Sequence, residues 1–183
     1  MKKLIEIKKK KVNDWFKSLQ KKMINQFQLM ETEISKKNKK KVKLFVKRGW
    51  KKDNKKEGGG ISYLLSGGEI FDKIGVNQST VSGKFEKSFR SKVLGAEKNG
   101  RYWASGISVV AHMKNPKIPA LHFNTRFIVT SKSWFGGGMD ATPSFFDKKE
   151  KNFIHQKLKS VCKTNHKNYN KYKKWCDNYF YLP

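Results

Sequence analysis

Arginine is scarce in this strongly basic chain. Its 183 residues include 42 Lys or Arg and 14 Asp or Glu, for a formal net charge of +28. Only Arg48, Arg90, Arg101 and Arg126 are arginines, so 38 of the basic residues are lysines. Arg is the side chain preferred for bidentate contacts with phosphates and bases. The lysine excess therefore favours a solvated surface over nucleic-acid recognition, and a basic nucleic-acid-binding module is kept as the alternative function.

Cysteine and long apolar runs are also scarce. Cys162 and Cys176 are the only cysteines and form no CxxC pair, so two reduced thiols are expected. No uninterrupted apolar run approaches the ~18 residues that span a bilayer. The opening MKKLIEIKKKK has no apolar core of the kind found in secretory signals. These absences predict a cytoplasmic protein without a membrane partner.

The hydrophobic spacing predicts helices near both ends of the chain and strands between them. A three-and-four spacing of apolar residues indicates an amphipathic helix over 12–34, and further helices are expected over about 147–163 and 167–180. Alternation predicts a half-exposed strand over 42–46 and another over 76–81, with Asn77 and Ser79 on one face. A helical or irregular turn is expected over 70–74 and irregular structure over 84–101. This order is typical of an α+β fold with an antiparallel sheet.

Residues 104–126, ASGISVVAHMKNPKIPALHFNTR, predict a β-hairpin with one polar face. Side chains alternate between faces along a strand. Ser108 and His112 therefore share one face of the first strand, and His122, Asn124 and Arg126 share one face of the second. Two imidazoles on facing strands suit metal binding or proton transfer. The guanidinium of Arg126 suits a carboxylate or phosphate, or an internal ion pair with Asp140.

Two glycine triplets, 58–60 and 136–138, are weak signals for anion-binding loops, because neither has the form of a phosphate loop. Asp140 follows the second triplet. It either caps a helix or exposes its carboxylate to a pocket.

Four blocks of the sequence resemble one enzyme family. EGGGISYLLSGGEIFDKIGVNQSTVSGK, GISVVAHMKNPKIPALHFNTRF, WFGGGMDATPSFFD and YKKWCDNYFYLP are similar, in this order and with compatible spacing, to oxygen-dependent coproporphyrinogen III oxidase. The resemblance implies an α+β fold with a large antiparallel sheet flanked by helices, usually in a homodimer. It also implies that two propionates of coproporphyrinogen III are oxidatively decarboxylated to vinyl groups, giving protoporphyrinogen IX in haem biosynthesis.

The same resemblance implies roles for particular residues. His122 matches a proton donor, and Asp140 matches the aspartate of the WFGGG block. Ser108 matches a substrate-binding serine, and Asn124, Thr125 and Arg126 match a substrate-binding triplet in which Thr replaces Val. His112, His122 and His155 match histidines assigned to a divalent metal in some members. Dioxygen is the expected oxidant, no organic cofactor is expected, and backbone amides of the glycine loops are expected to help bind the propionates.

The resemblance also predicts how much of the family's domain is present. It ends at Pro183, before the family's C-terminal part. We therefore expect one incomplete domain over 1–183, with a helix and a Lys-rich loop over 1–41 and a portion of the catalytic core over 42–183. Such a chain is expected to be weakly active or inactive by itself.

Overall fold

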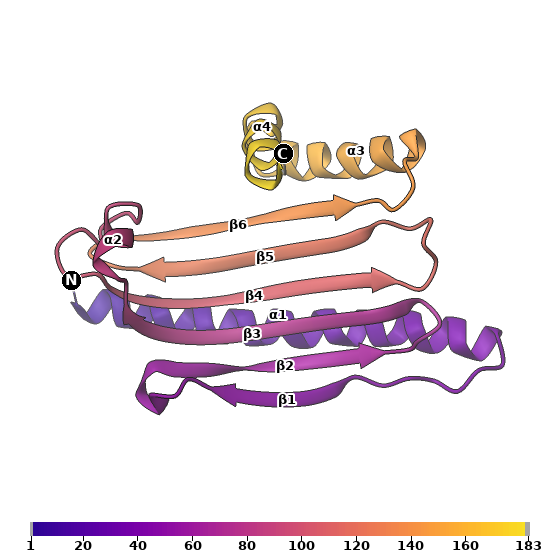
Figure 1. Ribbon diagram of the computed structural model, residues 1–183, viewed down its shortest axis with the longest axis horizontal. Coiled ribbons are helices and arrows are strands. Elements are labelled where there is room, and N and C mark those ends of the chain that lie inside the picture. The colour runs from indigo at the N-terminus through magenta and orange to yellow at the C-terminus, as the bar shows by residue number, and fades with distance from the viewer. Residues whose placement is uncertain (1, 182–183) are drawn as a thin grey trace.

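The protein folds around one antiparallel sheet of six strands in sequence order (Figure 1). The computed structural model describes residues 2–181, so Pro183 lies outside the described residues. This architecture confirms the expected α+β class. The strands are β1 (Val46–Lys51), β2 (Gly58–Ser66), β3 (Phe71–Lys84), β4 (Arg101–Met113), β5 (Ala120–Val129) and β6 (Ser133–Thr142).

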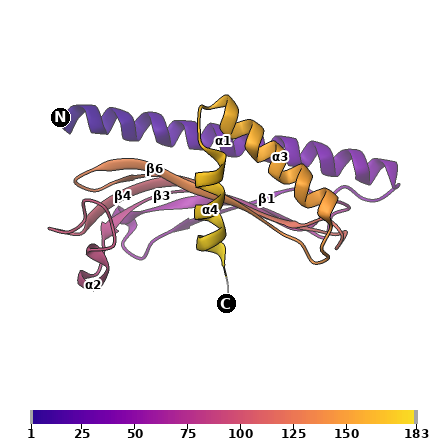
Figure 2. The same ribbon diagram turned by 90° about the horizontal axis from the view of Figure 1, so that it is seen from above.

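A single long helix, α1 (Lys2–Lys37), covers one face of the sheet (Figure 2). At about 1.5 Å per residue its 36 residues extend about 54 Å, enough to run the length of the longest strand. Phe16 is fully buried and packs with Val76, Ile107, Val109 and Phe127. The expected apolar stripe is therefore confirmed in its centre, whereas Trp15 and Met30 are exposed.

Polar side chains fix the position of α1 on the sheet. The Gln20 amide donates to the carbonyls of Ile61 (2.8 Å) and Val76 (2.9 Å), on two neighbouring strands. Farther along the helix, the buried Glu31 carboxylate accepts backbone N–H groups at the β2–β3 turn. These directional bonds set the register of helix against sheet, which apolar packing alone does not specify.

The remaining helices lie at the ends and edge of the sheet. A 3-10 turn, η1 (Lys55–Glu57), joins β1 to β2, and the short α2 (Lys87–Arg90) follows β3. Helices α3 (Lys148–Thr164) and α4 (Tyr169–Phe180) follow β6. Figure 2 shows α4 crossing the β6 edge from the α1 side toward the opposite side. The sheet face away from α1 therefore stays open over its central strands.

Several expected elements differ from the structure. Residues 71–74 belong to β3 rather than to a turn, and β1 begins at Val46 rather than running over 42–46. Both glycine triplets lie inside strands, in β2 and β6, so the expected anion-binding glycine loops are wrong. In β3 and in the glycine triplets, pairing with neighbouring strands sets an extended backbone where the local sequence favours a loop. At 42–45 the reverse holds, because the alternating residues pair with no neighbouring strand among those described and β1 begins only where pairing with β2 begins.

Candidate functional site

The open face of the sheet carries the polar residues that the hairpin pattern predicts. In β4, Ile107, Val109 and Ala111 are buried beneath α1, and the alternating residues Ser108 and His112 point away from it. In β5, Phe127 lies on the α1 face, which places His122, Asn124 and Arg126 on the open face. The strand register therefore brings five of the predicted side chains to one surface.

The pairing register arranges this surface in rows that cross the strands. One row begins at the basic Arg48 on β1, continues with the hydroxyl and amide groups of Ser62, Asn77, Ser108 and Asn124, and ends at Gly138. The next row is mostly small, and it consists of Trp50, Gly60, Ser79, Gly106, Arg126 and Gly136. A row of small residues between larger ones leaves a depression across the sheet.

This depression is a hollow of about 570 Å³. Its lining includes Trp50 and Ser62 at one side, Asn77 and Ser108 in the middle, and Arg126 at the other side. The volume lies within the roughly 300–1,000 Å³ typical of small-molecule sites. The hollow thus has the size and the polar lining of a ligand site.

Arg126 has no ion-pair partner among residues 2–181. Its side chain is exposed and makes no hydrogen bond or salt bridge, because Asp140 pairs with His122 and Thr142 instead. The predicted alternative of an internal Arg126–Asp140 pair is therefore wrong. A guanidinium that faces a hollow without a carboxylate partner is available to bind an anionic ligand.

His122 and Asp140 form a hydrogen-bonded pair on β5 and β6, next to the hollow but outside its lining. They face each other across β5 and β6, with His122 Nδ1 3.3 Å from Asp140 Oδ2. The Thr142 hydroxyl donates to the same Asp140 oxygen at 2.6 Å. If Nδ1–H donates to the carboxylate, the ring presents Nε2 as the proton-accepting atom. Asp140 is thus a strand residue beside His122, not a helix cap, and that function belongs to Asp147, which accepts Lys149 N at 2.7 Å.

The histidines expected to bind a metal do not form a ligand set. His112 and His122 are neighbours, with ring centroids 6.0 Å apart, but His155 lies on α3 and its Nδ1 is 2.7 Å from the Tyr169 hydroxyl. Within the described part of the chain, no group of three or more His, Cys, Asp or Glu residues is placed to hold a metal ion. The residues present do not fit the expected three-histidine site, and we derive no step through a metal.

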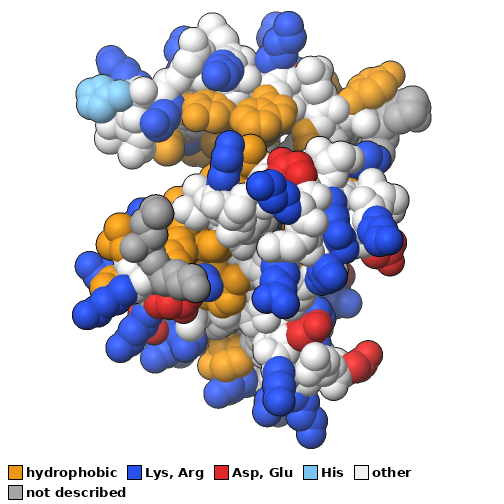
Figure 3. All heavy atoms as spheres, turned by 90° about the vertical axis from the view of Figure 1, so that its left-hand side faces the viewer, with side chains coloured by type: hydrophobic (Ala, Val, Ile, Leu, Met, Phe, Trp, Pro, Cys, Tyr) orange, Lys and Arg blue, Asp and Glu red, His pale blue; other side chains and the backbone are white. Residues whose placement is uncertain are grey.

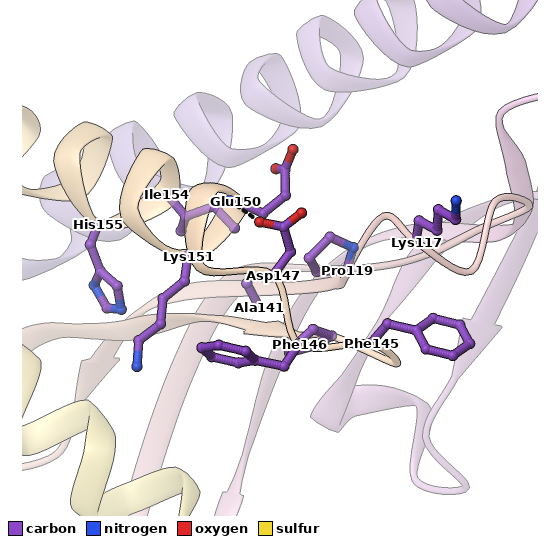
Figure 4. A pocket seen from close by; sticks show the side chains of 11 residues that line it. Lys117, Pro119, Ala141, Phe145, Phe146, Asp147, Glu150, Lys151, Ile154 and His155 are labelled. Carbon is purple, nitrogen blue, oxygen red and sulfur yellow. Dashed lines mark hydrogen bonds between the residues drawn. The ribbon is translucent and has the colours of Figure 1, made fainter.

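His155 instead lines a second, smaller hollow of about 240 Å³ beside α3 (Figure 4). His155, Lys151 and Phe146 project to one side of the helix start, whereas the carboxylates of Asp147 and Glu150 point to the other. Burial lowers the pKa of His155 below its usual 6.5, and the nearby Lys173 and Lys151 act in the same direction. None of the other predicted site residues lines this hollow.

Thr125 lies differently from the other predicted substrate-binding residues, and Trp50 lines the hollow without having been predicted. Thr125 pairs with Ile107 and lines the hollow, but alternation directs its side chain to the α1 face. Trp50 lines the hollow although the sequence analysis did not select it. The available signal was its place two residues after Arg48 in a strand leading to a glycine triplet.

Basic side chains of the described residues are spread over one end of the molecule and do not gather in a single patch there (Figure 3). At the end of the molecule seen in Figure 3, Lys and Arg are scattered among a few acidic residues.

Cys162 and Cys176 are both free thiols, as expected. No helix within residues 2–181 combines the length and apolar character that crossing a bilayer requires.

Comparison with known proteins agrees with the resemblance of the four blocks. The family described as coproporphyrinogen III oxidase matches residues 11–183. The chain is 46% identical over 171 residues to oxygen-dependent coproporphyrinogen-III oxidases of Rickettsia bellii (strain OSU 85-389), Rickettsia akari (strain Hartford) and Rickettsia rickettsii (strain Sheila Smith). These matches cover 93% of this chain, and the chain spans 60% of the length of each relative. No comparison supports the nucleic-acid-binding alternative.

Proposed function

The chain belongs to the coproporphyrinogen III oxidase family, and we propose that its open sheet face binds coproporphyrinogen III for oxygen-dependent decarboxylation. The observation that carries this proposal is the unpaired Arg126 at the hollow between β1 and β5. A substrate with four carboxylates needs at least one cation that no protein carboxylate already neutralises. Ser108 and Asn124, one row away, supply further hydrogen-bonding groups for a propionate.

The His122–Asp140 pair is proposed to handle the proton of the reaction. Asp140 holds the imidazole through Nδ1, which leaves Nε2 free to exchange a proton with a pyrrole N–H or with the developing product. Both roles follow from the pairing of His122 on β5 with Asp140 on β6.

Dioxygen is proposed as the oxidant, in line with the printed names of the relatives. Each propionate carboxylate loses carbon dioxide, two electrons and one proton from the carbon next to the pyrrole ring as its side chain becomes a vinyl group. Dioxygen accepts the two electrons, this proton and one further proton from solvent to give hydrogen peroxide, so each step balances without an organic cofactor. The residues of this chain bind the substrate, orient it and move the proton.

Assembly is part of the proposal. The relatives are longer than this chain, and we propose that turnover by the family's enzyme uses groups beyond the hollow described here, in a homodimer. We further propose that the chain acts in the cytoplasm.

The test is anaerobic calorimetric titration of the chain with coproporphyrinogen III. Replacing Arg126 with Gln removes a charge-assisted contact, and about 1.4 kcal/mol or more of lost binding corresponds to at least about a tenfold rise in Kd. Arg101→Gln is the matched control, because alternation places Arg101 at the β4 terminus on the opposite face. Admission of air to the complex and measurement of vinyl product then tests turnover. Absence of binding, or equal Kd for R126Q and R101Q, contradicts the proposal.

A further inference from the structure

Trp50 occupies the far end of the small-residue row from Arg126. It pairs with Gly60 in the adjacent strand, and Gly60 is followed across the sheet by Ser79, Gly106 and Arg126. Four strand spacings of about 4.8 Å separate the β1 and β5 backbones, or about 19 Å. The two large side chains of the row therefore bracket the hollow at opposite ends.

The indole lies across the floor of this row instead of away from it. A Cβ built on Gly60 would come within 2.8 Å of Trp50 Nε1 and 3.0 Å of Cε2. The absence of a side chain at Gly60 is what gives the indole this position. Trp50 still exposes 43% of its surface, and it lines the hollow together with Ser62 and Asn77.

An exposed indole opposite a free guanidinium suits a ligand that carries both a ring system and a carboxylate. Aromatic rings pack on one another with a preference beyond the area buried, and an indole adds an N–H donor. A carboxylate bound by Arg126 leaves the ring system of the same molecule directed along the row toward Trp50. The polar row of Asn77 and Ser108 flanks this path on one side.

We propose that Trp50 is a substrate-binding residue that contacts a pyrrole ring of the tetrapyrrole whose propionate binds Arg126. This inference rests on the proposed function and adds to it a second anchoring point on β1, outside the β4–β6 region that carries the other site residues. Trp50 thereby selects for a ring system of the correct span, because a ligand held by Arg126 reaches it only across the whole row.

The experiment compares Trp50→Phe and Trp50→Leu in anaerobic titration with coproporphyrinogen III. W50L raises Kd about tenfold because the aromatic contact is lost, whereas W50F stays within about threefold of the unmodified chain. Trp15→Leu is the control, since Trp15 is similarly exposed but lies on α1 at the opposite face. A role in folding alone would lower the thermal midpoint and would affect binding by W50F and W50L alike.

A second measurement keeps the inference testable if W50L folds poorly. Coproporphyrin III, the oxidised and coloured form of the ligand, quenches tryptophan emission by energy transfer that is strongest for the nearest indole, and the quenched fraction falls in W50F but not in Trp15→Phe. Equal quenching in both variants overturns the Trp50 contact. Binding that depends on Arg126 but not on Trp50 refutes only this inference, whereas absence of binding by the unmodified chain refutes the proposed function as well.

Discussion

Replacement of Glu31 tests how α1 is attached to the sheet that carries the site. The Glu31 side chain is 0% exposed, and no cation pairs with it among the described residues. Its carboxylate accepts the backbone N–H of Ile70 at 2.9 Å and of Phe71 at 3.3 Å, together with that of Glu69 and the Ser35 hydroxyl. The carboxylate thus accepts the backbone N–H groups of the β2–β3 turn, as the carbonyl groups of a neighbouring strand do within a sheet.

The energetic cost of Glu31→Ala follows from these contacts. The variant leaves three backbone donors without their acceptor, at about 1–3 kcal/mol for each donor that water does not reach. Partial access of water at Glu69 and Ile70 reduces the sum to about 2–6 kcal/mol, a large share of the 5–15 kcal/mol typical of a domain. Glu31→Gln keeps one oxygen acceptor, so about half of that loss is expected.

Urea denaturation followed by circular dichroism measures the loss, and hydrogen exchange at Ile70 and Phe71 locates it. Glu33→Ala is the matched control, because Glu33 lies two residues farther along the same helix and is exposed. The reasoning fails if E31A and E33A destabilise the chain equally. It also fails if exchange at the β2–β3 turn is no faster in E31A than in the unmodified chain.

Two further predictions concern the hollow and the α3–α4 contact. Gly106→Ala places a Cβ 2.7 Å from the Thr125 carbonyl oxygen and 2.9 Å from Arg126 Cβ, so we expect about 1–3 kcal/mol of destabilisation in urea and weaker coproporphyrinogen III binding; unchanged affinity would contradict the placement of Arg126. Burial lowers the pKa of His155, so the folded state binds fewer protons than the unfolded state just below pH 6.5. Stability from this group is therefore complete above about pH 6.5 and is lost as the pH falls through the lowered pKa. The thermal midpoint should drop less on acidification in His155→Gln, and identical profiles for the two proteins would refute this.

The central hairpin was predictable because its physical signal is strong and local. Alternation of apolar and polar residues assigns Ser108, His112, His122 and Arg126 to one face without knowledge of the rest of the fold, and the structure has this arrangement. The helices were predictable for the same reason, because a 3.6-residue period needs only the positions of apolar residues. The roles of these side chains in the reaction stay predictions.

The parts that sequence reasoning missed depend on contacts between distant segments. The glycine triplets become strands because neighbouring strands pair with them, as Gly60 does with Trp50 and Ser79. Propensity alone disfavours glycine in a strand, so local reasoning assigns a loop. His155 was grouped with His112 and His122 by resemblance, yet α3 directs it to Tyr169. Spacing in the sequence carried no information about that direction.

The glycines of the small-residue row link the fold to the site. Gly60, Gly106 and Gly136 all have ordinary extended backbone, since the glycines with positive φ are at other positions. Each glycine in a strand costs about 0.5–1 kcal/mol relative to a residue with a side chain, so backbone conformation does not explain the row. Close approach explains two of them: a side chain at Gly60 would meet Trp50, and one at Gly106 would meet Arg126. The glycines therefore allow the two largest side chains of the row to lie across its ends while the floor between them stays open, and α1 packing on the other face supplies the stability that this arrangement requires.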